Sequence, residues 1–331
     1  MTRVVRFHET GGPEVMQIEE IDIGAPGAGE MRVRIEAFGL NRAEAVFRAG
    51  TYLEQPKLPA RNGYEAAGII EAIGSGVEGF MVGDAICVIP AFSLNSYGVY
   101  AEQAIVPARA VVKRPAGVSA VEGAAIWMSY LTAYGALIEI GKLARGEVVI
   151  IPAASSSVGL AAIQIANSIG AIPIATTRTG AKVEAIRQAG AAHVIATSEQ
   201  DLVAEVMRIT DGKGARMAFD PVAGPGIDTL AQALAREGIL FVYGNLSKQP
   251  APFPGKWAMS KGLTLRGYLL FEVTGDPQRL ERALAFVTRG LESGQFKPTI
   301  DRTFAFDDIV EAHRYLESNQ QFGKIVVAVP G

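Results

Sequence analysis

The pattern of apolar positions along the chain changes near Gly123. Before this residue, short β-like runs such as Arg32–Ala37 and Gly68–Ala72 are separated by many glycine and proline residues, which predicts a compact, irregular, β-rich domain. After it, apolar strands alternate with helical segments. The predicted strands are Val148–Ile151, Ile172–Thr176, His193–Ala196, Met217–Asp220, Ile239–Tyr243 and Leu263–Tyr268, and the predicted helices are Ser157–Ile169, Ala181–Ala189, Asp201–Thr210 and Gly226–Arg236. Strands that are apolar throughout and are joined by helices indicate a parallel sheet covered on both faces.

The last part of the chain returns to a mixed pattern. It predicts helices over Pro277–Leu291 and Asp307–Ser318 and a final apolar strand over Lys324–Val329. A terminal strand of this kind needs a sheet to join, and either domain could accept it. The length of 331 residues fits two domains better than one.

Composition and charge exclude several classes of protein. Hydrophobic residues make up 49% of the chain and charged residues 20%, so both domains can form real cores. The net charge of −3 gives no basic surface for nucleic acid. No ionisable residue occurs between Val148 and Thr177, but Pro152 and a serine triplet interrupt this stretch, as expected for a strand, a turn and a helix rather than a membrane span. With no secretory signal visible at the start, we expect a soluble, cytoplasmic protein.

The single cysteine, Cys87, cannot form an intramolecular disulfide, and its apolar surroundings predict a small core residue. The three histidines, His8, His193 and His313, are scattered and lack the spacing of metal ligands. We therefore predict no metal site, and structural or surface roles for these histidines.

A turn of small residues follows the strand Val148–Ile151 and opens the next helix. The usual dinucleotide fingerprint has three glycines at such a turn, and Ala154, Ser156 and Gly159 occupy these positions here. Small side chains still allow close approach of a phosphate to the backbone N–H groups and the positive helix end. The alternative is an ordinary strand-to-helix turn with a serine N-cap.

The end of the second strand favours a phosphorylated cofactor. A site specific for NAD has Asp or Glu at this point to bind the ribose 2′-hydroxyl. This sequence has Thr177, Arg178 and Lys182 and no carboxylate, which suits the 2′-phosphate of NADPH. The alternative is a solvated basic start of a helix.

At this point the sequence resembles the medium-chain dehydrogenase/reductase superfamily, specifically its zinc-free quinone oxidoreductase branch. The motifs extend over essentially the whole chain: 39–44 (GLNRAE), 50–52 (GTY), 63–68 (GYEAAG), 82–84 (VGD), 130–134 (YLTAY), the serine-rich turn, 219–224 (FDPVAG), 243–245 (YGN) and 323–324 (GK). The resemblance implies a GroES-like catalytic domain, residues 1–123 and 267–331, a Rossmann domain, residues 124–266, and an active-site cleft at their junction. The zinc-dependent branch would have a cysteine near Asn41 and a histidine beside Glu65, and both are absent.

The resemblance also assigns roles to individual residues. Asn41 and Thr132 are expected near the nicotinamide, and Tyr52 and Asn41 are the candidate hydrogen-bond donors for the developing anion. The expected cofactor contacts are Ser156, Ser157 and Val158 at the pyrophosphate, Thr177, Arg178 and Lys182 at the 2′-phosphate, and Tyr243, Gly244 and Asn245 at the carboxyl edge of the sheet. Thr197 stands where some relatives have a tyrosine near the adenosine.

These features predict an NADPH-dependent reductase that transfers hydride to a quinone or an activated enone without a metal. Three alternatives remain: an enoyl-thioester reductase, an NADPH-binding scaffold or sensor with negligible turnover, and alcohol or aldehyde chemistry. An enoyl-thioester reductase would need a basic groove for the carrier phosphate, and no such cluster is evident. Loops such as Ala91–Tyr100 are expected to set the substrate by shape.

The strand Leu263–Tyr268 is predicted to be the last of the parallel sheet and therefore an edge. Leu263 and Leu265 alternate with Thr264 and Arg266, which is typical of an edge strand with one covered face. We expect this edge to pair with the same strand of a second chain in a homodimer. The alternative is a monomer whose edge is protected by Lys261 and Arg266.

Overall fold

The computed structural model describes residues 1–330, which form two compact units. One consists of residues 1–128 and 298–330, and the other of Ser129–Lys297. Among the helices of the described residues, none combines the length and the apolar character that a membrane span requires.

The second unit contains a six-stranded sheet in which every neighbouring pair is parallel. Its strands are β9 (Val148–Ile151), β10 (Ile172–Thr177), β11 (His193–Ala196), β12 (Ala215–Asp220), β13 (Leu234–Val242) and β14 (Thr264–Gly267). The spatial order β11-β10-β9-β12-β13-β14 is the doubly wound order 3-2-1-4-5-6 of a dinucleotide-binding fold. The predicted parallel sheet is therefore confirmed.

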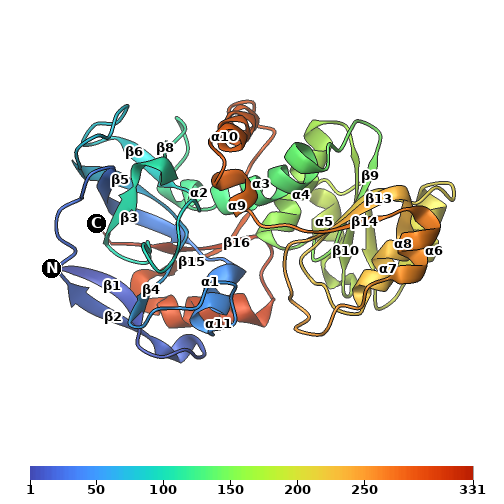
Figure 1. Ribbon diagram of the computed structural model, residues 1–331, viewed down its shortest axis with the longest axis horizontal. Helices are drawn as coiled ribbons and strands as arrows, with labels where there is room; N and C mark the ends of the chain where they lie inside the picture. Colours follow the sequence, from blue (N-terminus) through green and yellow to red (C-terminus); the bar gives the residue numbers. More distant parts are fainter. Residues whose placement is uncertain (331) are drawn as a thin grey trace. The chain divides into compact units, whose positions relative to one another are not determined.

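Helices lie on both faces of this sheet (Figure 1). They are α4 (Ser157–Ser168), η4 (Gly180–Lys182), α5 (Val183–Gln188), α6 (Leu202–Ile209), α7 (Gly226–Ala233) and α8 (Gly255–Lys261). On one face, Leu202 and Val206 of α6 and Leu230 of α7 join a buried cluster with Ile150 and Leu240 of the central strands. Burial of these aliphatic side chains, about 1.5–3 kcal/mol each, holds the layers together.

Several element boundaries differ from the prediction, and two of these differences change where a helix of the second unit begins or ends. The helix expected over Gly226–Arg236 ends at Ala233, because Leu234 is fully buried and already pairs with Ala215 in the sheet. The helix expected over Ala181–Ala189 begins as the short 3₁₀ turn η4, and its α-helical part begins at Val183.

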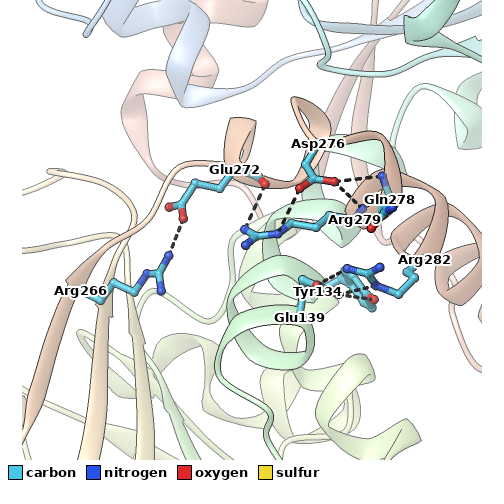
Figure 2. Close-up of polar contacts among 8 residues, drawn as sticks. All are labelled: Tyr134, Glu139, Arg266, Glu272, Asp276, Gln278, Arg279 and Arg282. Atoms are coloured by element: carbon cyan, nitrogen blue, oxygen red, sulfur yellow. Dashed lines mark hydrogen bonds and ion pairs between the residues drawn. The ribbon is translucent and has the colours of Figure 1, made fainter.

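Residues 267–297 belong to the second unit, whereas the predicted domain boundary placed them in the first. Tyr268 is buried, and a Cβ on Gly135 would lie 2.0 Å from its hydroxyl, so the two segments are packed without space between them. The helix α10 (Pro277–Glu292) packs on the π-helix η3 (Gly135–Ile140), where Arg282 Nη2 lies 2.6 Å from Glu139 Oε1. Figure 2 shows this pair and the cap of α10, where Asp276 accepts hydrogen bonds from two backbone N–H groups.

The segment between β14 and α10 is also tied to the second unit. Arg266, on β14, forms an ion pair of 2.5 Å with Glu272 in the short helix α9 (Phe271–Thr274) (Figure 2). This ion pair is local in sequence, whereas Tyr268 and Arg282 meet Gly135 and Glu139 from a distant part of the chain. Neither kind of contact follows the apolar pattern from which the boundary was predicted.

The first unit is built mainly from two sheets. A three-stranded sheet has the order β2-β1-β4, and a seven-stranded sheet has the order β15-β16-β3-β5-β6-β8, with β7 also paired to β3. The strands are β1 (Thr2–Phe7), β2 (Met16–Ile21), β3 (Glu30–Gly39), β4 (Ala60–Arg61), β5 (Glu65–Ile73), β6 (Ala85–Val88), β7 (Gln103–Pro107), β8 (Val111–Lys113), β15 (Ile300–Ala305) and β16 (Lys324–Ala328). The final strand β16 thus joins this unit, antiparallel to β3 and parallel to β15.

Short helices complete the first unit. They are η1 (Pro13–Val15), α1 (Arg42–Arg48), η2 (Ala108–Ala110), α2 (Ala120–Gly123), η5 (Phe306–Asp308) and α11 (Ile309–Ser318), and α3 (Trp127–Tyr134) begins here and continues in the second unit. The buried Arg48 of α1 donates to His313 Nδ1 of α11 at 2.7 Å. Burial lowers the pKa of His313 to about 3, so this histidine is neutral and structural, as predicted. Cys87 is fully buried in the core, also as predicted.

Candidate nucleotide site and buried polar cluster

The turn after β9 has the geometry of a phosphate-binding turn in which only one glycine remains. Ser156 is the N-cap of α4, and its hydroxyl oxygen accepts the N–H of Gly159 at 3.1 Å. Ala153 adopts the left-handed backbone conformation with φ of 48°. A non-glycine residue in this region is strained, as is common at functional turns.

The turn requires a glycine at position 159. A Cβ at this position would lie 2.7 Å from the Cα atom of Ala154, which is closer than packed atoms approach. This is the role of the third glycine in a dinucleotide fingerprint, where the helix packs directly against the turn. At the first turn of α4, the N–H groups of Ser157 and Val158 have no intrahelical acceptor and lie at the positive helix end. The turn can therefore hold an anion such as a pyrophosphate.

A basic side chain from η4, shortly after β10, approaches this turn. Lys182 Nζ lies 3.4 Å from Ser155 Oγ, although 27 residues separate them in sequence. Arg178 is exposed, and the carbonyl of Thr177 accepts the N–H of Thr197 at 2.9 Å. The structure therefore places the predicted 2′-phosphate residues at the same edge of the sheet as the predicted pyrophosphate residues.

Glu199 contacts the segment 178–182, and the sequence did not predict this contact. Its Oε1 accepts the backbone N–H of Gly180 at 2.8 Å, between Arg178 and Lys182 in sequence. The pairing of β10 with β11 brings residues 197–199 beside residues 177–180. The residues that follow the second strand in sequence therefore do not reveal this carboxylate. One feature of the sequence does point to it: Glu199 is an acidic residue three positions after the end of the third strand.

The ends of β12 and β13 form the next part of this edge. Tyr243 stacks on Phe219 with ring centroids 4.0 Å apart, and burial raises the pKa of its hydroxyl well above the usual value. A Cβ on Gly244 would lie 2.7 Å from the carbonyl oxygen of Pro221, so a close approach of two loops requires this glycine. Asn245 is exposed. Tyr243 is thus packed against its neighbouring strand, while Asn245 faces solvent.

Thr132 lies on α3, where it is 7% exposed. This helix packs against α4, since the hydroxyl of Tyr130 donates to Gln164 Oε1 at 2.7 Å. Thr132 is therefore on a helix that contacts the helix of the phosphate-binding turn.

Asn41 belongs to a buried polar cluster in the first unit. Its Nδ2 donates to Glu44 Oε1 and to Glu65 Oε1, both at 3.0 Å, and its Oδ1 accepts a hydrogen bond from Lys324 Nζ at 2.6 Å. Lys324 also forms an ion pair with Glu65. Glu65 Oε2 accepts the N–H of Met128 at 2.9 Å, so the cluster joins the start of α1, β5, β16 and α3.

The cluster has one carboxylate more than its cation can neutralise. Burial raises the pKa of Glu44 to about 7, and Lys324 acts in the opposite direction. Glu44 Oε2 is buried and has no hydrogen-bond partner among the described residues. Both N–H bonds of the Asn41 amide are directed to carboxylates, so Asn41 does not offer the free donor that was predicted for it.

Tyr52 follows α1 on a loop and is half-buried. Burial raises the pKa of its hydroxyl, and the hydroxyl of neighbouring Tyr64 acts in the opposite direction. The loop is held by Glu54, which accepts hydrogen bonds from Ser93 and Asn95. Tyr52 is therefore a positioned phenol, and the segment that fixes it lies in the stretch 91–100 that was expected to shape the substrate site.

No three His, Cys, Asp or Glu side chains gather as metal ligands in residues 1–330. By the resemblance described above, Asn41 and Tyr64 stand where the zinc-dependent branch is expected to have ligands, and Lys324 places an ammonium group beside Asn41.

Comparisons with known proteins match this architecture. The alcohol dehydrogenase GroES-like domain matches residues 27–116, and the zinc-binding dehydrogenase family matches residues 157–289. A quinone oxidoreductase of Pseudomonas aeruginosa is 31% identical over 99% of both chains, and a 2-haloacrylate reductase of a Burkholderia species is 28% identical over 99% of both. The crystal structure of Escherichia coli quinone oxidoreductase complexed with NADPH superimposes with a TM-score of 0.91 at 30% identity, covering 98% of this chain and 99% of that one.

The fold, the nucleotide turn and these similarities define the class of protein. The chain belongs to the medium-chain dehydrogenase/reductase superfamily, in its zinc-free quinone oxidoreductase branch. It combines a GroES-like domain with a Rossmann domain, and it is an oxidoreductase.

Proposed function

We propose that this protein reduces a quinone or an activated enone with NADPH and without a metal. The observation that carries the proposal is the pair of basic residues, Arg178 and Lys182, at the end of β10, with Lys182 reaching the phosphate-binding turn at Ser155. The similarity to a quinone oxidoreductase that binds NADPH supports the cofactor, and the similarity to a 2-haloacrylate reductase supports an electron-poor double bond as acceptor.

The residues of the second unit fit this cofactor. The N–H groups of Ser157 and Val158 would bind the pyrophosphate beside the cap formed by Ser156, and Thr177, Arg178 and Lys182 would bind the 2′-phosphate. NADPH supplies a hydride when it is bound. Thr132, Tyr243, Gly244 and Asn245 of this unit are further proposed cofactor contacts, and Asn41 of the first unit is another.

We assign to Tyr52 the role of proton donor. Hydride addition to an enone leaves a negative charge on oxygen, and a positioned phenol stabilises this charge by donating its proton. Because the amide of Asn41 already donates to Glu44 and Glu65, we assign Asn41 to ordering the buried cluster rather than to the anion. A quinone needs less acid assistance, since the hydroquinone anion is already stabilised.

The test is a panel of substrates, with oxidation of NADPH followed by its absorbance in the presence and absence of a chelator. Quinones and activated enones are expected to be reduced at rates that the chelator does not change. Preferred reduction of enoyl thioesters would favour an enoyl-thioester reductase instead. Tight binding of NADPH with no oxidation in any reaction would favour a scaffold or sensor and would contradict the proposal.

A further inference from the structure

The loop after β11 lies alongside the segment that we assign to the 2′-phosphate. The carbonyl of Arg178 accepts the N–H of Ser198 at 2.9 Å and its hydroxyl at 2.6 Å, and Gly180 N–H donates to Glu199 Oε1 at 2.8 Å. A Cβ on Gly180 would lie 3.2 Å from Glu199 Oε2, so both oxygens of the carboxylate lie against this residue. The loop therefore fixes a carboxylate against the backbone of the segment that carries Arg178 and Lys182.

The two signs of charge favour different nucleotides. A carboxylate near the end of the second strand accepts the ribose 2′-hydroxyl of NADH, whereas a guanidinium or ammonium group binds the 2′-phosphate of NADPH. In this chain the cations come from the residues after β10, and the carboxylate comes from the loop after β11. Only Oε1 is used by Gly180, which leaves Oε2 for a further donor.

We propose that Glu199 is a cofactor-specificity residue that opposes the 2′-phosphate and accepts the ribose 2′-hydroxyl, so that this protein uses both NADPH and NADH with a narrow preference for NADPH. The inference rests on the proposed function for the location of the nucleotide. Glu199 and Arg178 are both exposed, so solvent screens the repulsion. Repulsion between two exposed unit charges that lie near each other in water changes an affinity by a factor of a few, which sets an expected effect of about three- to tenfold.

Glu199→Gln is the variant that isolates the charge. Its amide oxygen can still accept the N–H of Gly180, so the loop keeps its hydrogen bond while the negative charge is lost. The probes are 2′,5′-ADP and 5′-AMP, which differ at the 2′-phosphate, with affinities measured by calorimetry at low and high salt. The ratio of kcat/KM for NADPH to that for NADH is measured alongside.

The variant is expected to bind 2′,5′-ADP three- to tenfold more tightly, with a smaller gain at high salt, and to leave 5′-AMP unchanged or slightly weaker. The NADPH-to-NADH ratio should rise by a similar factor. Glu205→Gln is the matched control: it changes the net charge equally on α6, where Glu205 pairs with Arg208, and should move neither affinity.

Two results would overturn the inference. Unchanged or weaker binding of 2′,5′-ADP in Glu199→Gln would show that Glu199 only supports the loop, and a preference of the natural protein for NADPH above about a thousandfold would exclude dual use. If the fragments bind as expected but no substrate is reduced with either nucleotide, the proposed reaction fails while the role of Glu199 stands.

Discussion

The ammonium group of Lys324 donates a hydrogen bond to the amide oxygen of Asn41 at 2.6 Å, although 283 residues separate them in sequence. Lys324 and its ion-pair partner Glu65 are 1% and 0% exposed. Water cannot stabilise either charge at this depth, so each depends on the other and on the hydrogen bonds of Asn41 and Met128. The last strand of the chain is thereby fixed to the start of α1 and of β5.

Lys324→Met should lower the free energy of unfolding by about 3–5 kcal/mol, because it leaves the Glu65 carboxylate buried without a cation. Urea denaturation measures the change. Lys113→Met is the control, since Lys113 is 62% exposed and lies 3.5 Å from Asp84, and it should cost at most about 1 kcal/mol. The double variant Lys324→Met with Glu65→Gln should recover part of the loss. Equal stability of Lys324→Met and Lys113→Met would contradict this account.

Glu44 should make the protein less stable as the pH rises toward neutrality. Its pKa is raised from 4.5 to about 7 in the folded state, so the folded protein holds the proton more tightly than the unfolded chain. This contribution is fully present below about pH 4.5 and is lost as the pH rises through about 7, a change of about 3 kcal/mol.

His313 titrates in the opposite sense, since its pKa is lowered from 6.5 to about 3: its contribution to stability is fully present above about pH 6.5 and is lost as the pH falls through about 3. The comparison is therefore made between the natural protein and Glu44→Gln, both unfolded in urea at pH 5 and pH 8. The difference between the two proteins should change by about 3 kcal/mol over this interval. A difference that does not depend on pH would show that Glu44 is ionised throughout.

Arg178→Ala should raise the KM for NADPH by at least about tenfold, or about 1.4 kcal/mol, and leave the KM for NADH nearly unchanged. The side chain is exposed and the backbone carbonyl holds Ser198, so the variant should keep the loop intact. Steady-state kinetics with both cofactors measures the effect. Equal increases of the KM for the two cofactors would show that Arg178 does not bind the 2′-phosphate.

The sequence predicted those parts of the protein that depend on short-range pattern. The strand-to-helix turn at Gly159 and the basic residues after the second strand follow from local spacing, and the structure places them at one edge of the sheet. The partners of Asn41 could not be predicted, because Lys324 reaches it from the other end of the chain. The contact of Glu199 with Gly180 could not be predicted either, because it depends on the pairing of two parallel strands.

Tyr52→Phe should slow the reduction of enones by about a hundredfold or more if Tyr52 is the general acid, and should slow quinone reduction much less. Replacing the phenol removes the donor but keeps the ring that packs on the loop. The rate constants for one enone and one quinone, measured under saturating NADPH, provide the comparison. Full rates with both substrates would assign Tyr52 a structural role.

The edge strand β14 has the geometry that pairing with a second chain would need. It pairs with β13 on one side only, and Tyr268 N–H donates to Val242 O at 2.9 Å. Because successive N–H groups point to opposite sides of a strand, those of Leu265 and Gly267 face the open edge. Leu265 packs on the core cluster, so the side chains of this strand hold it on the sheet and leave its outer edge open. Met259 and Leu269, on the segments that flank β14, are 81% and 42% exposed and add apolar surface.

Leu265→Pro should therefore release monomers from a homodimer that we expect to form across β14. Proline removes the outward N–H at the middle of the edge but leaves the hydrogen bonds to β13, which come from the residues on either side. Leu265→Ala is the matched control, because it loses the same apolar side chain and keeps the donor, and it should stay dimeric. Light scattering of the natural protein at micromolar concentration should give about twice the chain mass of 35.0 kDa. A single-chain mass for the natural protein, or monomers with both variants alike, would show that backbone pairing at this edge does not hold two chains together.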